Sequence, residues 1–331
     1  MAVSSKTNLA IVGLGRWGEV LVRSVQGKSA TTGFGAVVSR SPDRVGAMAR
    51  DLGLVVLPDL SAALLDPAID GIVVTTPHSS HAAAIAACRS AGRPVLVEKP
   101  FTLTRASADA AIEHGSSMVF AAHNRRFLPA VKAILDAVRD GVLGDLLHIE
   151  ANFSGNMVGR YKQGMWRADD KESPAGGLAG SGIHMIDLII ALAGPVESVH
   201  AQSSRRVVAL SIDDTMTATL RMESGASAVL SCVTATASCF RLEVFGTNGS
   251  AELRGVEQLT ITALDGSSRS SNFTPTDIER LELEAFSDAI RGTAEFPITL
   301  EEVLNGVSVF EGISRSLDCG RTVSVRRSDT P

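Results

Sequence analysis

Between residues 9 and 122 the sequence alternates short apolar runs with longer amphipathic stretches. The apolar runs are continuously hydrophobic, as in parallel strands covered on both faces, and the amphipathic stretches are typical of crossover helices. The pattern predicts an α/β fold with a doubly wound parallel sheet of the Rossmann type. The expected strands are 9–14, 35–39, 71–75, 94–98 and 118–122, and the expected helices are 16–26, 42–52, 81–91 and 105–114.

Beyond Asn124 the pattern changes to longer alternating segments, which are typical of antiparallel strands. A turn at Ser224-Gly225 joins two of them as a hairpin, and a meandering sheet is the simplest arrangement. Helical periodicity returns near the end of the chain, so this half is predicted to be α+β. The expected strands are 146–154, 196–206, 215–222, 226–233 and 241–246, and the expected helices are 130–140, 276–292 and 300–318.

The length of 331 residues suits two domains, which we place at 1–124 and 125–331. A formal charge of -5 argues against a nucleic-acid or anionic-membrane partner, since both need a concentrated basic surface, and small-molecule partners are expected instead. The four cysteines have scattered spacings, and nothing before Leu9 resembles a secretion signal, which predicts reduced thiols in the cytoplasm. The most apolar helical run, 183–193, is too short to cross a bilayer.

A glycine-rich motif lies directly after the first expected strand and before the first expected helix. Its residues are Gly13, Leu14, Gly15, Arg16, Trp17 and Gly18. In a G-x-G-x-x-G turn the first glycine permits a tight turn, the second lets the backbone approach a pyrophosphate, and the third allows close helix packing. The phosphates then lie at the helix N-terminus. The strand and helix on either side favour dinucleotide binding over a glycine-rich turn without a ligand.

The end of the second expected strand indicates which dinucleotide is bound. An NAD site normally carries an acidic residue there for the ribose diol, whereas this strand ends in Ser39 and Arg40. A guanidinium offers several donors to the oxygens of a 2′-phosphate, so NADP is the expected cofactor and NAD is the alternative. The other interpretation is a solvated loop in which Asp43 caps the next helix.

Two further motifs supply groups that can move a proton. Glu98-Lys99-Pro100 ends the fifth expected strand, where ligands meet open parallel sheets, and Lys99 would orient a substrate oxygen beside the cofactor. His184 and Asp187 open an apolar helix and share one of its faces, so the carboxylate would influence the imidazole. An isolated Lys-Pro is more often a surface turn, and a lone histidine on an apolar face is more often a core residue. The combination of the two favours a site.

Together these residues resemble the glucose-fructose oxidoreductase, inositol dehydrogenase and rhizopine-catabolism family, called Gfo/Idh/MocA. The likeness runs over nearly the whole chain. It includes the glycine turn, Thr76-Pro77 with His81, Glu98-Lys99-Pro100, Asn124-Arg125-Arg126-Phe127, Trp166-Arg167, Gly176-Gly177, Gly182 to Asp187, and Gly320-Arg321-Thr322-Val323. Singly these motifs are weak, but in this order they are specific.

The resemblance implies a Rossmann domain followed by a mostly antiparallel open sheet whose outer face makes a homodimer or homotetramer. It implies that Lys99 is the catalytic lysine and His184 the acid/base or substrate-orienting histidine. Cofactor contacts are implied for Thr76, Pro77, His81, Glu98 and Arg126, and substrate contacts for Tyr161, Lys162, Trp166, Arg167 and Asp187. The cations of the 160–167 segment would suit a sugar acid, although solvated loop charge is the commoner explanation.

One position departs from the family pattern. Sugar and inositol dehydrogenases of this kind usually have an aspartate four residues before the histidine, where this chain has Gly180. The expected activity is NAD(P)-dependent hydride transfer to or from a sugar, sugar acid, polyol or related carbonyl compound. A diol or imine reductase of the same family is one alternative, and a sensor that binds the dinucleotide without turning it over is another.

Overall fold

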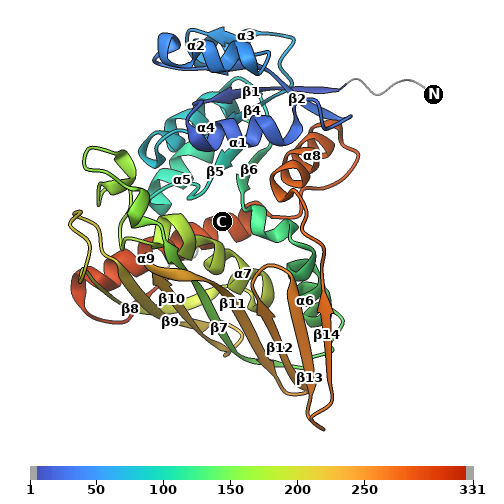
Figure 1. The fold of residues 1–331 in the computed structure, drawn as a ribbon, viewed down its shortest axis with the longest axis vertical. Helices are drawn as coiled ribbons and strands as arrows, with labels where there is room; N and C mark the ends of the chain where they lie inside the picture. The colour runs from blue at the N-terminus through green and yellow to red at the C-terminus, as the bar shows by residue number, and fades with distance from the viewer. Residues whose placement is uncertain (1–5, 326–331) are drawn as a thin grey trace. The chain divides into compact units, whose positions relative to one another are not determined.

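The computed structural model describes residues 6–325, which form two compact units (Figure 1). The first unit comprises the chain up to Thr102, then Ala106–Asn124 and Asp277–Val303. The second comprises Leu103–Arg105, Arg125–Thr276 and the chain from Leu304 onward. The chain passes from the first unit to the second after Asn124.

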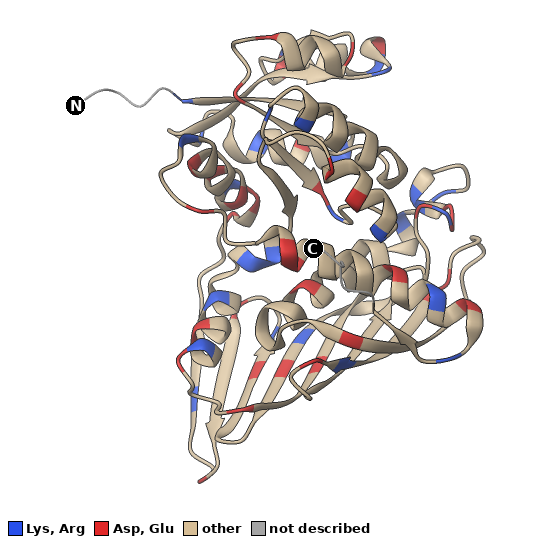
Figure 2. Ribbon diagram, turned by 180° about the vertical axis from the view of Figure 1, so that it is seen from behind, with Lys and Arg blue, Asp and Glu red and all other residues tan. Residues whose placement is uncertain are grey.

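The first unit is built on a six-stranded parallel sheet in the order β3-β2-β1-β4-β5-β6. This is the strand order of a doubly wound dinucleotide-binding sheet, which reverses between β1 and β4, so the predicted Rossmann fold is confirmed. Figure 2 shows these strands almost entirely without charge, as expected for strands covered on both faces. The strands are β1 Thr7–Val12, β2 Thr32–Val38, β3 Val55–Leu57, β4 Gly71–Val74, β5 Val95–Glu98 and β6 Val119–Ala122.

Helices connect these strands, and each predicted helix of this half is present with its end shifted by one or two residues. One short strand, β3, and the six-residue helix α3 that follows it were not predicted from the sequence. The helices are α1 Arg16–Val25, α2 Pro42–Asp51, α3 Leu60–Leu65, α4 His81–Ser90 and α5 Arg105–Ile112, with a 3₁₀ turn, η1, at His78–Ser80.

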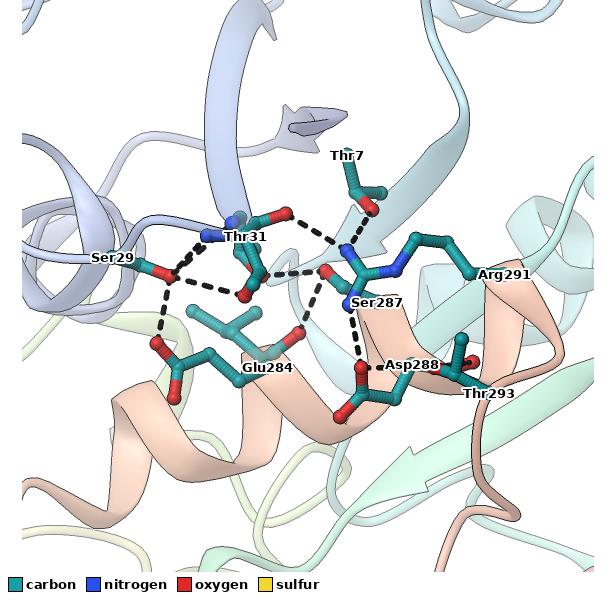
Figure 3. Close-up of polar contacts among 10 residues, drawn as sticks. Thr7, Ser29, Thr31, Glu284, Ser287, Asp288, Arg291 and Thr293 are labelled. Atoms are coloured by element: carbon teal, nitrogen blue, oxygen red, sulfur yellow. Dashed lines mark hydrogen bonds and ion pairs between the residues drawn. The ribbon is translucent and has the colours of Figure 1, made fainter. Parts of the chain in front are cut away.

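Helix α8 (Ile278–Arg291) comes late in the chain but belongs to the first unit, whereas the sequence analysis assigned it to the second domain. Figure 3 shows its polar contacts with Thr7, the first residue of β1, and with Ser29 and Thr31, which precede β2. The hydroxyl of Thr32 donates to Ser287 Oγ at 2.7 Å, and that of Ser29 donates to Glu284 at 2.7 Å. Phe286 is fully buried on the same helix, so both apolar packing and hydrogen bonds hold α8 here.

The second unit is built on a nine-stranded sheet in the order β14-β13-β12-β11-β7-β10-β9-β8-β15. The predicted hairpin between β9 and β10 is present, but the sheet is not a simple meander. Strand β7 lies between β11 and β10 and runs parallel to β10, while the other pairs are antiparallel. The strands are β7 Leu146–Asn156, β8 Val196–Ser204, β9 Thr215–Met222, β10 Ser227–Val233, β11 Ala235–Gly246, β12 Gly249–Arg254, β13 Gln258–Ala263, β14 Ser268–Asn272 and β15 Val323–Ser324.

Three helices accompany this sheet: α6 (Pro129–Arg139), α7 (Ile183–Ala193) and α9 (Leu300–Cys319). Helix α6 packs on β12 and β13, and α7 packs on β7 and β10. A π-helical turn, η5 (Leu178–Gly182), runs directly into α7, which is buried along nearly its whole length. Among residues 6–325, no helix combines the length and the apolarity that a membrane span requires.

Candidate active site

The glycine-rich turn has the geometry that its sequence predicts. Gly13 has a φ of +97°, in the left-handed region that favours glycine, and its N–H donates to Val38 O at 3.0 Å, which ties the turn to β2. A Cβ at Gly18 would clash with the carbonyl oxygen of Gly13, so α1 passes this close to the turn only because position 18 has no side chain. The hydroxyl of Thr75 donates to that same carbonyl at 2.5 Å.

The start of α1 is open to a ligand. Gly15 is the N-cap residue, no side chain caps the helix, and a Cβ at Gly15 would meet no atom within 4 Å. The first N–H groups of a helix lack intrahelical acceptors and, with the helix dipole, bind anionic phosphates. Leu14 is buried beneath the turn and Arg16 is exposed beside it. These features fit the pyrophosphate of a dinucleotide.

The glycine turn is joined to the end of β5 by one hydrogen bond. The indole N–H of Trp17 donates to Oε1 of Glu98, which is buried. The backbone N–H of Lys99 approaches Oε2 of the same carboxylate at 3.3 Å. Lys99 is half-buried and follows β5 directly. The carboxylate therefore holds two of the predicted motifs together at the carboxyl end of the parallel sheet.

A buried histidine holds the neighbouring loop in the same way. The ring of His81 is fully buried, with Nδ1 2.9 Å from the carbonyl oxygen of Pro100 and Nε2 3.0 Å from that of Thr76. Thr76 and Pro77 follow β4, and Pro100 follows Lys99. His81 thus links the loops after β4 and β5, and its ring holds these two loops together at the carboxyl edge of the sheet.

The two residues proposed for the cofactor ribose follow β2. Ser39 is half-buried, and its hydroxyl accepts the N–H of Ser41 at 3.2 Å. Arg40 is exposed. Helix α2 then begins at Pro42, with Asp43 in its first turn. The end of β2 therefore presents a hydroxyl and a guanidinium, and the next carboxylate along the sequence, Asp43, belongs to α2.

In the second unit, His184 lies in the first turn of α7 and is 5% exposed. Its ring is 6.0 Å from that of Phe153 on β7. The guanidinium of Arg125 lies 5.6 Å from the centre of the same phenyl ring, in the range of a cation–π contact. The imidazole therefore lies beside the Phe153 ring of β7, and it belongs to a different unit from Lys99.

Arg126 and Asp187 form a buried ion pair. Arg126 Nε donates to Oδ2 at 2.7 Å and Nη2 donates to Oδ1 at 3.0 Å, which is a bidentate arrangement. Nη2 also approaches the Asp187 carbonyl oxygen at 3.3 Å. The two side chains are 6% and 4% exposed. Both residues were expected at the site from the sequence, but nothing in the sequence paired them, because they are 61 positions apart.

The segment expected to meet the substrate contains two short 3₁₀ turns, η3 (Val158–Arg160) and η4 (Trp166–Ala168). The guanidinium of Arg167 stacks 4.0 Å from the centre of the Trp166 ring, and Lys162 is exposed. A Cβ at Gly180 would lie 3.9 Å from the hydroxyl of Tyr161. The structure thus brings the tyrosine next to the position where the family pattern has a carboxylate.

The part of the chain from residue 6 to 325 contains no cluster of histidine, cysteine or carboxylate side chains arranged to bind a metal ion. One buried polar residue of the second unit was not expected from the sequence. Asp214 is 1% exposed and its carboxylate accepts three backbone N–H groups of the preceding loop. A single aspartate in an irregular loop carries no pattern that would have revealed these contacts.

Two family models match the chain. Residues 7–118 match the model described as the oxidoreductase family, NAD-binding Rossmann fold, of GFO/IDH/MocA proteins. Residues 131–252 match the GFO/IDH/MocA C-terminal domain. The two matches cover every strand of the parallel sheet except β6, and most of the second sheet, in the order in which the units follow along the chain.

Individual proteins show the same likeness. Trans-1,2-dihydrobenzene-1,2-diol dehydrogenase of Bos taurus is 29% identical over 191 residues, which are 57% of this chain and 56% of that protein. D-xylose 1-dehydrogenase (NADP(+)) 2 of Haloferax volcanii is 28% identical over 88% of this chain and 91% of that protein. The chain therefore spans about half the length of the diol dehydrogenases that it matches, and nearly all of the xylose enzyme.

Among solved structures, levoglucosan dehydrogenase in complex with NADH and levoglucosan superposes with a TM-score of 0.88. Its sequence is 19% identical, and the match covers 98% of this chain and 100% of that one. At this identity the superposition establishes a shared fold.

Proposed function

The chain belongs to the Gfo/Idh/MocA family of oxidoreductases, and we propose that it transfers hydride between NADP and a C–OH or C=O carbon of a small hydroxylated compound. The observation that carries the proposal is the start of α1. The uncapped helix terminus, the open space at Gly15 and the close passage of Gly18 together fit a dinucleotide pyrophosphate.

The preference for NADP over NAD rests on the end of β2. Ser39 and the exposed Arg40 stand where a ribose-binding carboxylate would select NAD, and a guanidinium suits a 2′-phosphate. The name of the Haloferax volcanii relative includes NADP(+), whereas levoglucosan dehydrogenase was solved with NADH. Arg40→Ala is expected to weaken NADP binding by roughly 10- to 100-fold through the loss of charge-assisted hydrogen bonds. NAD binding should hardly change, and Arg50→Ala, on the last turn of α2, is the matched control.

When bound, the nicotinamide ring gives or takes the hydride. The Lys99 ammonium would donate a hydrogen bond to the reacting oxygen of the substrate, and His184 would take up or deliver the proton of that oxygen. Glu98 supports this role because it holds the backbone of Lys99 and the side chain of Trp17 at one place. The protein contributes orientation, which converts a reaction between separate molecules into one within a complex.

For the substrate we propose a sugar, polyol or related diol. Two relatives support this class, one named for a cyclic diol and the other for D-xylose. Sugar acids are the more specific possibility, because Lys162 and Arg167 lie on the segment that also carries Tyr161 and Trp166. Arg167, however, is stacked on Trp166, and an exposed lysine is commonly solvated. A uronate turned over less efficiently than its parent sugar would exclude selection for a carboxylate.

The test is a screen of sugars, sugar acids, inositols, diols and their keto forms at 340 nm with NADP(H). Lys99→Ala should abolish turnover and leave NADP binding intact, because the phosphates are held by the glycine turn. Lys132→Ala, an exposed position on α6, is the control and should behave as the unmodified protein. If a substrate is found and Lys99→Ala turns it over normally, the assigned role of the lysine is wrong.

A second candidate is a sensor that binds the dinucleotide without turning it over. Gly180 favours it, because no carboxylate stands one turn before His184 to take part in a proton relay. Tight NADP binding with no change of absorbance over the whole screen, which should include imines for the alternative reductase, would support the sensor. Turnover of any compound in the screen would exclude it.

We also propose that the chain forms a homodimer or homotetramer through the outer face of the second sheet. Arg241 pairs with Glu150 at 2.8 Å on that face, and Glu243 lies between Glu150 and Glu252 on neighbouring strands. Figure 2 shows the alternating charged bands along these strands. Such rows could pair with those of a second copy about a two-fold axis. Because its cysteines are free thiols, we place the protein in the reducing cytoplasm.

A further inference from the structure

The loop between β8 and β9 is organised around one carboxylate oxygen. Oδ2 of Asp214 accepts the backbone N–H groups of Arg206 at 2.8 Å, Val207 at 2.7 Å and Val208 at 3.2 Å. Asp214 is 1% exposed, whereas Arg206 and Val207 are exposed. The loop has few buried side chains, so the Asp214 carboxylate satisfies backbone N–H groups that no regular element pairs, alongside a hydrogen bond from Arg205 to the carbonyl oxygen of Leu210 at 3.0 Å.

The pKa of Asp214 agrees with this arrangement. Burial acts to raise the pKa, but the three N–H donors and the charge of Arg206 outweigh burial and lower it below the usual value. Asp214 is therefore ionised throughout the physiological range. Its hydrogen bonds are charge-assisted and stronger than those between neutral groups.

The same loop forms the support for the segment that leads to His184. Gly176 has a φ of +57°, and a Cβ there would clash with the carbonyl oxygen of Asp213, so the glycine backbone lies flat against the loop. Thr234 donates its N–H to the carbonyl oxygen of Asp214 at 2.8 Å. Its methyl group would be 2.7 Å from a Cβ at Gly177. Gly176 therefore packs against Asp213 and Gly177 packs against Thr234, and both contacts depend on the position of the loop that Asp214 holds.

A second contact reaches the start of that segment. Ser211, in the same loop, donates its hydroxyl to the carbonyl oxygen of Ala168 at 3.1 Å. Ala168 closes the η4 turn, which carries Trp166 and Arg167. The loop therefore contacts the segment 166–182 at Ala168 and at Gly176, before η5 continues into α7 and His184.

We propose that Asp214 is a positioning residue for this segment: by fixing the 205–214 loop, it sets where Trp166, Arg167 and the His184 turn lie. This inference rests on the proposed function, since it assigns the segment to substrate binding and His184 to proton transfer. Asp214 acts through the loop and its backbone, so it should affect substrate turnover and leave the cofactor site in the first unit unchanged.

The first test is hydrogen exchange followed by mass spectrometry on the whole protein with Asp214→Ala. Faster exchange in the peptides covering 166–184 is expected, since the loop loses its acceptor. Asp265→Ala is the matched control, because Asp265 also accepts a backbone N–H at 2.9 Å, from Ser267, but at the β13–β14 hairpin. This readout does not need activity, so it decides the inference even if the wild-type chain shows no turnover, which would contradict only the proposed function.

Kinetics provide the second test. Asp214→Ala should lower kcat/KM by roughly 10- to 100-fold with an unchanged dissociation constant for NADP, while Asp265→Ala should leave both unchanged. All three N–H groups meet a single oxygen, so Asp214→Asn should stay within about threefold of wild type, because an amide oxygen can still accept them.

Several results would overturn the inference. They are wild-type exchange and kcat/KM in Asp214→Ala, or an Asp214→Asn variant as impaired as the alanine. If Asp214→Ala does not fold, Ser211→Ala decides, because Ser211 is exposed and its loss removes one link to the segment. Faster exchange around residue 168 in that variant supports the inference, and unchanged exchange there refutes it.

Discussion

The buried pair of Arg126 and Asp187 allows the sharpest prediction. In Asp187→Asn the two short contacts at 2.7 and 3.0 Å lose their charge, while the guanidinium stays in a site where its own side chain is only 6% exposed. Leaving one member of a buried ion pair without its opposite charge costs about 3–5 kcal/mol. With a denaturant slope of about 3 kcal/mol per molar urea, the unfolding midpoint should fall by roughly 1–1.7 M.

Urea unfolding of two further variants completes the measurement. Arg126→Met combined with Asp187→Leu should recover most of the loss, because neither charge is then left alone in an apolar site. Glu150→Gln breaks the pair with Arg241, whose side chains are 39% and 40% exposed, and should cost at most about 1 kcal/mol. A loss below about 1 kcal/mol in Asp187→Asn, or a double variant as unstable as the single one, would refute this account of the pair.

The same variants separate two roles for Asp187. The sequence placed it among the substrate-binding residues, whereas in the structure both oxygens of its carboxylate accept hydrogen bonds from Arg126. If the role is structural, the charge-free double variant keeps the wild-type KM at a temperature where it is folded. A substrate KM raised more than tenfold in that variant, with an unchanged dissociation constant for NADP, would instead place the pair in contact with the substrate.

Three further predictions concern ionisation, thiol reactivity and packing. Burial and neighbouring carboxylates raise the pKa of Glu243, so folding disfavours the ionised form of this side chain. The protein therefore loses stability as the pH rises from the pKa of Glu243 in the unfolded chain to its pKa in the folded protein. Glu243→Gln should therefore unfold at a higher urea concentration than wild type at pH 7, with no difference at pH 3. Burial raises the pKa of Cys88 to about 12, so iodoacetamide at pH 8 should modify the exposed Cys239 and leave Cys88 intact until the protein unfolds. Ser287→Ala removes the acceptor of the Thr32 hydroxyl in a fully buried position, and equilibrium unfolding should show a loss of about 1–3 kcal/mol.

The sequence predicted the elements whose pattern is strong and missed those that are short or polar. Strands such as Gly71–Val74 are wholly buried, so their unbroken apolar run identified them. Strand Val55–Leu57 is a three-residue edge strand with an exposed first residue, too short for any periodicity. Strand β14 has the sequence SRSSN and is largely exposed, so it carries no apolar alternation to detect.

Helix α8 shows a different limit. Its amphipathic pattern predicted a helix with one buried face, but the pattern does not indicate which part of the protein that face covers. The decisive partners are residues such as Ser29 and Thr32, 255 positions away from the residues that they contact. The same is true of Arg126 with Asp187. Local patterns therefore predicted the elements and the motifs, while pairings between distant residues required the structure.

At position 180 the sequence pattern and the structure together suggest a role for a neighbouring residue. The sequence showed only that a side chain usual in the family is missing at Gly180. The structure shows what surrounds that position: the hydroxyl of Tyr161, the one tyrosine of the chain, and the sulfur of Met157 lie 3.9 and 3.8 Å from where a Cβ would be. A carboxylate accepts hydrogen bonds only, whereas a phenol hydroxyl can also donate one. If the chain is the enzyme proposed, the Tyr161 hydroxyl beside position 180 can hydrogen-bond a substrate oxygen. Net proton transfer is then left to His184 and Lys99.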